Sequence, residues 1–236
     1  MIELQRLTIA HGSNLLFEDA STSFGRANLI ALVGRNGTGK STFLRALAGL
    51  DNKCCSGRIL IDGRDSSMPA ALRSRTVAFV HTARVRVPGM TCTDLVQLGR
   101  SPYTGWSGRL SDDDRLIVSK ALADTGMADY AGRQVDSLSD GECQRVMIAR
   151  AIAQTTPVIL LDEPTSFLDI PNRRQIVGLL QKLAHEAGKC ILFSTHELDI
   201  ALAMADRIAL IHDFKLHNLS PRELESSKLL DSLLGR

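Results

Sequence analysis

The chain has 236 residues, of which 44% are hydrophobic and 23% charged, so it can bury the core of one large domain and is not expected to be disordered. The 28 lysines and arginines nearly balance the 26 aspartates and glutamates, and only 4% of residues are aromatic, a composition that argues against a basic, base-stacking nucleic-acid binder. The five cysteines form no CxxC pair, so we expect free thiols. No apolar run approaches the ~20 residues of a membrane-spanning helix, and the first ten residues lack a secretory signal. We therefore expect a cytosolic chain.

Strands and helices are predicted to alternate along most of the chain. Residues 4–10 alternate apolar and polar side chains, as a half-buried strand does, and 29–33 is a continuous apolar run that predicts a strand buried on both faces. Further short strands are expected at 59–61, 77–80, 158–161, 190–194 and 207–211. Apolar residues at helical spacing are Phe43, Leu44, Leu47 and Leu50, and then Ile176, Leu179, Leu180 and Leu183. This α/β pattern predicts a parallel sheet covered by helices on both faces.

Between about 91 and 153 the strand signals fade and helical spacing takes over. Ser111 followed by three aspartates is typical of a capped helix start, because acids in the first turn favour the helix dipole. We expect this segment to be a helical subdomain inserted into the α/β core, so that residues 1–236 form a single domain. The tail from His212 onward predicts only a short terminal helix.

The most specific motif is GRNGTGKS at 34–41, which satisfies G-x-x-x-x-G-K-[ST] between a buried strand and a helix, as a phosphate-binding loop requires. Its glycines let backbone N–H groups turn inward around phosphate oxygens, and the following helix presents its positive N-terminus to the same anion. Lys40 can reach the outer phosphates, and the Ser41 hydroxyl can ligate Mg²⁺. We therefore expect ATP and Mg²⁺ as ligands; a glycine-rich turn that binds nothing is disfavoured by the context. The expected nucleotide-binding residues are Gly34, Arg35, Asn36, Gly37, Thr38, Gly39, Lys40, Ser41 and Thr42.

A second motif ends the strand at 158–161 with two adjacent carboxylates, Asp162 and Glu163. Ligands of open α/β sheets bind outside the carboxyl ends of the strands. Asp162 is therefore expected to hold the metal, directly or through water, and Glu163 to polarise the water that attacks the terminal phosphate. The alternative is a pair of solvated acids before Pro164, which the presence of a phosphate-binding loop disfavours.

Two further stretches carry both a structural and a functional interpretation. The sequence LSDGE at 138–142 contains an S-x-x-E capping box, and a capped helix start is itself an anion site. His196 follows the strand at 190–194, where it could hydrogen-bond a phosphate or simply be a polar surface residue.

In this order and spacing, the motifs resemble the ATP-binding cassette (ABC) transporter ATPases over nearly the whole chain, and LSDGE resembles the signature of that family. The resemblance implies a P-loop NTPase core with an N-terminal antiparallel β subdomain and an inserted helical subdomain. It implies that His196 senses the γ-phosphate and that Asp169, in the D-loop at 166–169, crosses a dimer interface. It also implies a head-to-tail homodimer in the ATP-bound state, in which each ATP lies between one chain's phosphate-binding loop and the other's signature. The signature residues are Leu138, Ser139, Asp140, Gly141 and Glu142.

The sequence LGRSPY at 98–103 is similar to a stretch in the ATPases of importers for iron–siderophore complexes, haem and cobalamin, where the helical region docks on membrane subunits. A helix end followed by a proline turn is the structural alternative. The resemblance implies an ATPase that powers uptake of a metal chelate through integral-membrane permease subunits, with a substrate-binding protein as an indirect partner. It implies a peripheral location on the cytoplasmic face of the inner membrane, without nucleic-acid binding or insertion into lipid.

The chain departs from the family pattern at several positions. His11 stands where an aromatic residue usually stacks on adenine, and its imidazole stacks more weakly. Thr82 takes the place of a glutamine metal ligand and is too short to reach as far, so a bridging water would substitute. Asp140 and Glu142 replace a glycine and a glutamine, which adds negative charge beside a bound triphosphate unless these acids point outward.

Three alternative functions are weighed against this one. A DNA-maintenance ATPase of the same superfamily would carry a long coiled coil, for which residues 91–137 are too short and lack heptads. A small-molecule kinase would transfer phosphate to an acceptor and would not need LSDGE. The third alternative is an ABC ATPase of another system, for import of free metal ions or for export. Only the LGRSPY stretch argues against it.

Overall fold

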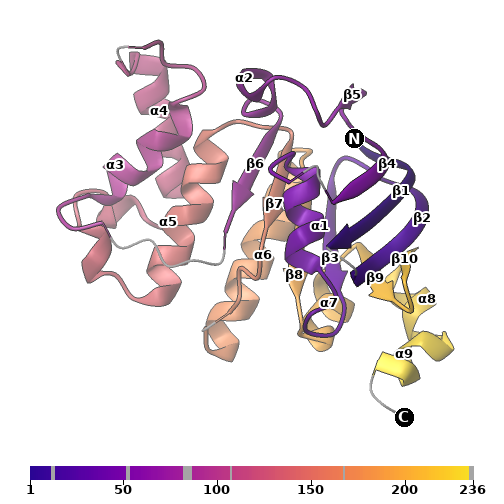
Figure 1. Cartoon of the computed structure of the whole chain (residues 1–236). Coiled ribbons are helices and arrows are strands. Elements are labelled where there is room, and N and C mark those ends of the chain that lie inside the picture. The colour runs from indigo at the N-terminus through magenta and orange to yellow at the C-terminus, as the bar shows by residue number, and fades with distance from the viewer. Residues whose placement is uncertain (12–13, 52–53, 82–86, 107, 167, 234–236) are drawn as a thin grey trace.

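The computed structural model describes residues 1–236 except 12–13, 52–53, 82–86, 107, 167 and 234–236, and it contains two β-sheets (Figure 1). The strands of the larger sheet are β3 (Asn28–Val33), β6 (Val77–Val80), β7 (Val158–Leu161), β8 (Cys190–Thr195), β9 (Arg207–His212) and β10 (Lys215–Leu219). They lie in the order β10-β9-β3-β8-β7-β6. All neighbouring pairs are parallel except β10 with β9, so the carboxyl ends of five strands meet along one edge.

The central strands of this sheet are apolar throughout because both of their faces are covered. Every residue of β7 and β8 is buried. In β3, Ile30 and Leu32 pack into a core with the smaller sheet, whereas Leu29 and Ala31 pack into a second core with helices. The parallel, doubly covered sheet expected from the apolar runs is therefore confirmed.

The smaller sheet is antiparallel and has the order β2-β1-β4-β5. Its strands are β1 (Ile2–His11), β2 (Asn14–Phe24), β4 (Cys55–Ile61) and β5 (Arg64–Asp65). The sequence pattern did not predict β2. Its register against β1 shifts at three places, so its buried residues do not alternate regularly with exposed ones.

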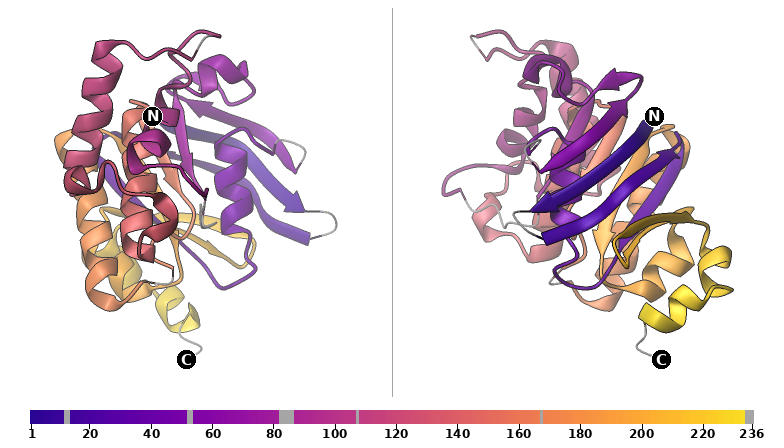
Figure 2. Two further views of the ribbon diagram at one scale, coloured as in Figure 1. Left: turned by 90° about the vertical axis from the view of Figure 1, so that its left-hand side faces the viewer. Right: turned by 45° about the vertical axis from the view of Figure 1, so that its right-hand side comes forward.

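Helices cover both faces of the larger sheet (Figure 2). On one side, α1 (Lys40–Leu47) packs with the smaller sheet, placing Phe43 and Leu44 in that core. On the other side lie α6 (Ile170–Glu186) and α7 (Leu198–Met204), whose buried residues join Leu29 and Ala31 of β3. The chain ends in two short helices, α8 (Pro221–Glu225) and α9 (Lys228–Leu233).

A group of helices lies beyond the edge strand β6, at the left of Figure 1. It contains α3 (Cys92–Gln97), the 3₁₀ turn η1 (Leu98–Arg100), α4 (Asp112–Asp124) and α5 (Asp140–Ala153), and α3, α4 and α5 pack against one another. Between α4 and α5 lie the 3₁₀ turns η2 (Ala128–Tyr130) and η3 (Val135–Ser137), while the short helix α2 (Ala70–Arg73) precedes β6. Among the described residues, no helix is long and apolar enough to cross a bilayer.

Candidate active site

The loop at 34–39 joins β3 to α1 and turns so tightly that glycine is required. A Cβ on Gly34 would lie 2.6 Å from the Thr38 hydroxyl oxygen and 3.1 Å from the Ile211 carbonyl oxygen. Gly37 and Gly39 have φ values of +81° and +84°, which residues with side chains rarely adopt. Since the N-cap of α1 is Gly39, no side chain caps the helix there, and the N–H groups of its first turn are available to an anion.

The Lys40 ammonium lies over this loop. Its Nζ atom donates hydrogen bonds to the Gly34 and Arg35 carbonyl oxygens, at 2.8 and 3.2 Å. Burial lowers the pKa of Lys40, and the carboxylates of Glu163 and Asp162 oppose that shift. The lysine is thus a buried cation placed where the sequence motif requires one.

Asp162 joins the loop to the carboxyl ends of β7 and β8. Its Oδ1 atom accepts hydrogen bonds from the Ser41 hydroxyl at 2.9 Å and from the Ser194 hydroxyl at 2.8 Å. The Glu163 N–H in turn donates to Ser194 Oγ at 2.8 Å. The parallel register of β7 and β8 makes this possible, because Leu161 pairs with Phe193 and the next residues along each strand are neighbours.

Glu163 lies in an unusual backbone conformation. Its φ of +46° falls in the left-handed region, which is costly for a residue with a side chain and is frequent at functional sites. Its Oε2 atom accepts a hydrogen bond from the Ser166 hydroxyl at 2.7 Å. The carboxylate expected to act as the base is therefore held at the edge of the sheet by the segment that follows it.

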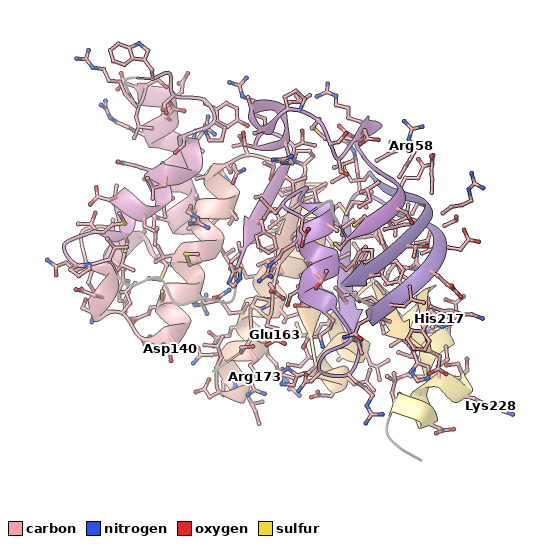
Figure 3. All side chains as sticks on the ribbon, in the orientation of Figure 1. Arg58, Asp140, Glu163, Arg173, His217 and Lys228 are labelled. Atoms are coloured by element: carbon pink, nitrogen blue, oxygen red, sulfur yellow. The ribbon has the colours of Figure 1, made fainter. Side chains whose placement is uncertain are left out.

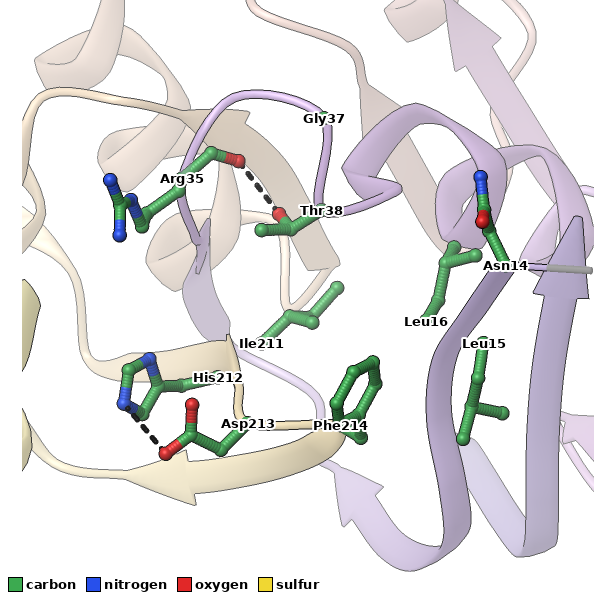
Figure 4. Close-up of a pocket in the computed structure, with 10 residues that line it drawn as sticks. All are labelled: Asn14, Leu15, Leu16, Arg35, Gly37, Thr38, Ile211, His212, Asp213 and Phe214. Atoms are coloured by element: carbon green, nitrogen blue, oxygen red, sulfur yellow. Dashed lines mark hydrogen bonds and ion pairs between the residues drawn. The ribbon is translucent and has the colours of Figure 1, made fainter.

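His196 is exposed and lies beside the same loop. It lines a cavity of about 480 Å³ with Gly34, Arg35, Asn36, Leu198 and Leu233. A second cavity of about 620 Å³ shares Arg35 with the first and is lined by Asn14, Leu16, Thr38 and Phe214 among others (Figure 4). His11 belongs to β1, but its side chain lies outside the described residues, as does the whole of Thr82.

The signature residues lie apart from this cluster. Ser139 is the N-cap of α5 and forms the predicted capping box: its hydroxyl accepts from the Glu142 N–H at 3.4 Å, and Glu142 Oε2 accepts from the Ser139 N–H at 2.8 Å. The Glu142 carboxylate is therefore turned back onto the start of its own helix, and the Ser139 N–H is the main cause of its lowered pKa. Figure 3 shows Asp140, in the first turn of α5, well separated from Glu163.

Asp169 caps another helix. Its side chain accepts a hydrogen bond from the Asn172 N–H at 3.0 Å, at the start of α6. The structure therefore brings the phosphate-binding loop, Asp162, Glu163 and His196 together. It leaves the stretch 138–142 outside that group, as a site completed by a second chain would require.

The LGRSPY stretch has a structural function within the helical group. A Cβ on Gly99 would overlap the Arg150 carbonyl group of α5. The Arg100 guanidinium is buried, donates to Asp114 Oδ1 at 2.8 Å and to the Ala153 carbonyl at 2.7 Å, and lies 4.0 Å from the centre of the Tyr103 ring. Most of the motif thus joins η1 to the ends of α4 and α5, whereas Leu98 remains half exposed.

Ser194 is a candidate site residue that the sequence motifs do not predict. The sequence alone does not reveal it, because its contact with Asp162 depends on the pairing of two strands that are about thirty residues apart in the chain. A hydroxyl at the carboxyl end of the strand beside the acidic pair was the available signal.

Comparison with known proteins gives a consistent result. A family model described as "ABC transporter" matches residues 17–166. The petrobactin import ATP-binding protein FpuD of Bacillus anthracis is 36% identical over 97% of this chain and 84% of its own length. The iron(3+)-hydroxamate import ATP-binding protein FhuC of Bacillus subtilis is also 36% identical, over 85% of this chain and 74% of its own length.

Solved structures agree with these matches. A structure described as a metal-chelate type ABC transporter in an inward-facing conformation superposes with a TM-score of 0.87 and 27% identity, covering 99% of this chain and 88% of its own. The dimeric, post-hydrolysis structure of the ATP-binding cassette MJ0796 with ADP and Pi gives a TM-score of 0.79 and 27% identity, covering 94% of this chain and 99% of its own.

Proposed function

The chain belongs to the ABC transporter family, and we propose that it is the ATPase subunit of an importer that takes up a metal chelate through integral-membrane permease subunits. The observation that carries the catalytic part is the pair of hydrogen bonds that Ser41 and Ser194 donate to Asp162, because they bring the loop and the carboxylates to one edge of the sheet. The names of the relatives, for petrobactin and iron(3+)-hydroxamate import, support an iron–siderophore complex as cargo over a free metal ion. The proposal keeps haem and cobalamin as the other chelates. The names of the relatives equally favour import over export.

In this proposal the ATP triphosphate lies in the loop formed by residues 34–42. The ammonium of Lys40 exchanges its carbonyl partners for phosphate oxygens, and the N–H groups at the start of α1 bind the same anion. Ser41 and Asp162 are hard oxygen donors, which suit Mg²⁺ held through one carboxylate together with phosphates. The bound ion would neutralise charge that develops on the phosphates.

Hydrolysis requires a positioned water molecule. The Glu163 carboxylate accepts a hydrogen bond from that water and polarises it. The Ser194 hydroxyl fixes the Glu163 backbone by accepting a hydrogen bond from the Glu163 N–H. The water oxygen forms a bond to the γ-phosphorus as the bond from that phosphorus to the bridging oxygen breaks, so ADP and inorganic phosphate leave. His196, exposed beside the loop, donates a hydrogen bond to the terminal phosphate.

A second copy of the chain completes the site. The first turn of α5 lies apart from the chain's own loop, and we infer that it faces the nucleotide of a partner copy, with Asp169 at the interface between the copies. The dimeric cassette with ADP and Pi supports this arrangement. The same proposal gives roles to two more residues. His11 stacks on the adenine, and Thr82 contacts the metal through a bridging water.

The proposal also includes the setting in which the ATPase acts. The protein works as a peripheral subunit on the cytoplasmic face of the inner membrane, bound to the permease rather than inserted into lipid. A substrate-binding protein delivers the cargo on the other side of the membrane. The names of the import ATPases support the permease partner.

The catalytic part is tested by following the fate of the γ-phosphate. ATP labelled at that position is incubated with the purified protein, with Lys40→Ala and with Lys120→Ala, whose lysine pairs with Asp124 on the surface of α4. We expect free phosphate from the wild type and from Lys120→Ala, and loss of ATP binding in Lys40→Ala. Transfer of the label to an acceptor, or full nucleotide affinity in Lys40→Ala, would contradict the proposal.

A further inference from the structure

One arginine connects two loops of the candidate site. Arg173 lies in the first turn of α6, and its Nε atom donates a hydrogen bond to the Leu168 carbonyl oxygen at 2.6 Å. Its Nη1 atom forms an ion pair with Glu197 Oε1. Leu168 belongs to the D-loop at 166–169 and Glu197 directly follows His196, so a single guanidinium connects both segments.

The buried carboxylate of Glu197 depends on Arg173 for its counter-charge. Its side chain is only 9% exposed, and within the described part of the chain neither of its carboxylate oxygens accepts a hydrogen bond. A buried carboxylate is costly without a counter-charge, which the Arg173 guanidinium provides. Helix α7 takes no side-chain cap from Glu197, since the contacts there come from its backbone: its N–H donates to Thr195 Oγ1 and its carbonyl accepts from the Ala201 N–H. The side chain is therefore not needed to start the helix.

The D-loop end of this connection reaches the signature helix. Leu168 is buried, and its Cδ2 atom lies 3.8 Å from the place that a Cβ on Gly141 would occupy. The Asn172 side chain lies 3.7 Å from the same place. The D-loop and the start of α6 thus pack against the first turn of α5, and contacts run from His196 through Glu197, Arg173 and Leu168 to Gly141.

We propose that Arg173 is a positioning residue that couples the two ATP sites of the dimer, an inference that rests on the proposed function. When His196 engages the terminal phosphate in one site, Glu197 moves with it. Arg173 transmits that displacement to the D-loop and to the start of α5, which serve the nucleotide of the other site. The planar fork of arginine holds the hydrogen bond to Leu168 and the ion pair with Glu197 at once, whereas the single ammonium of lysine favours one of the two contacts.

The test compares Arg173→Met with Arg174→Met, which removes the same charge from the next, exposed residue of α6. ATP-driven dimerisation is measured in the Glu163→Gln background and the Hill coefficient of hydrolysis in the active enzyme. We expect Arg173→Met to keep ATP affinity in the monomer within about twofold, to weaken dimerisation about tenfold and to bring the Hill coefficient close to 1, as loss of a coupling of ordinary size predicts. Arg174→Met should behave as the wild type does.

Two further variants separate coupling from stability. Adding Glu197→Gln to Arg173→Met removes the buried charge, so we expect it to recover the melting temperature but not the cooperativity. Arg173→Lys should keep the stability and lose most of the cooperativity, because its bond to Leu168 is lost.

Equal Hill coefficients and dimer affinities in Arg173→Met and Arg174→Met would overturn the inference. Recovery of cooperativity in the double variant, or full cooperativity in Arg173→Lys, would also overturn it. Failure of the proposed function is distinguishable, since Lys40→Ala would then bind ATP normally and Glu163→Gln would not dimerise with ATP.

Discussion

The hydroxyl of Ser194 donates a hydrogen bond to Asp162 Oδ1 at 2.8 Å and accepts one from the Glu163 N–H at the same distance. One buried side chain on β8 thereby fixes both the carboxylate proposed to hold the metal and the backbone of the proposed base. The left-handed conformation of Glu163 makes such support necessary, because a strained backbone persists only where its surroundings hold it.

Ser194→Ala should lower kcat without a comparable change in KM for ATP. The substitution leaves the Glu163 N–H without its acceptor and removes one of the hydrogen bonds to Asp162 Oδ1. A lost buried hydrogen bond costs about 1–3 kcal/mol, so we expect kcat to fall about tenfold or more. Steady-state kinetics check this, with Ser226→Ala as the control because that hydroxyl bonds a carbonyl of α8. A kcat equal to that of the control would show that Ser194 does not support the base.

Arg100 and Asp114 give a prediction for stability. Asp114→Asn removes the charge that pairs with the buried guanidinium, and we expect the free energy of unfolding at pH 7 to fall by roughly 3 kcal/mol. Asp113→Asn changes an exposed acid on the same turn and should have little effect. Chemical denaturation of both variants checks the difference.

The same pair has a defined pH dependence. The pKa of Asp114 is lowered from 3.8 by the Ser111 N–H, the Ser111 hydroxyl and Arg100. A carboxylate with a depressed pKa in the folded state contributes its stability above the pKa of the unfolded chain and loses it as the pH falls through the folded value. The advantage of wild type over Asp114→Asn should therefore hold at neutral pH and shrink below about pH 4. An advantage that persists unchanged to pH 3 would contradict this assignment.

Thr82→Gln should raise the basal ATPase rate. Glutamine reaches farther than threonine, and its amide oxygen would replace the bridging water that we infer between Thr82 and the metal. Basal and permease-stimulated hydrolysis are measured side by side, and the ratio between them should fall in the variant. Unchanged rates in both conditions would rule out a role for Thr82 in restraining hydrolysis.

The sequence predicted most of the larger sheet because its strands are covered on both faces. Runs such as 77–80 and 158–161 are apolar throughout, and their observed bounds are Val77–Val80 and Val158–Leu161. The sequence pattern did not predict strands β2 and β10, for different reasons. β2 has an irregular register against β1, and β10 is a short edge strand whose residues are mostly half-buried.

In the candidate site, too, some residues could be predicted from the sequence and others could not. The loop at 34–41 and the acids Asp162 and Glu163 were found because each motif is local in the chain. Ser194 and the Arg173–Glu197 pair were not, because their contacts depend on strand register and on the packing of loops distant in sequence. The LGRSPY stretch suggested a docking surface, yet Arg100 is buried and pairs internally, which supports the structural alternative for that residue.

Uptake by intact cells shows whether hydrolysis at this site powers import of a metal chelate. The native locus would carry Glu163→Gln or, as a matched control, Glu186→Gln, which changes an exposed glutamate at the end of α6. Labelled iron is supplied as a siderophore complex and as haem, and labelled cobalamin in parallel. We expect Glu163→Gln to abolish uptake of one of these chelates while the control takes up all three. Normal uptake of all three by cells that contain folded Glu163→Gln protein would contradict it.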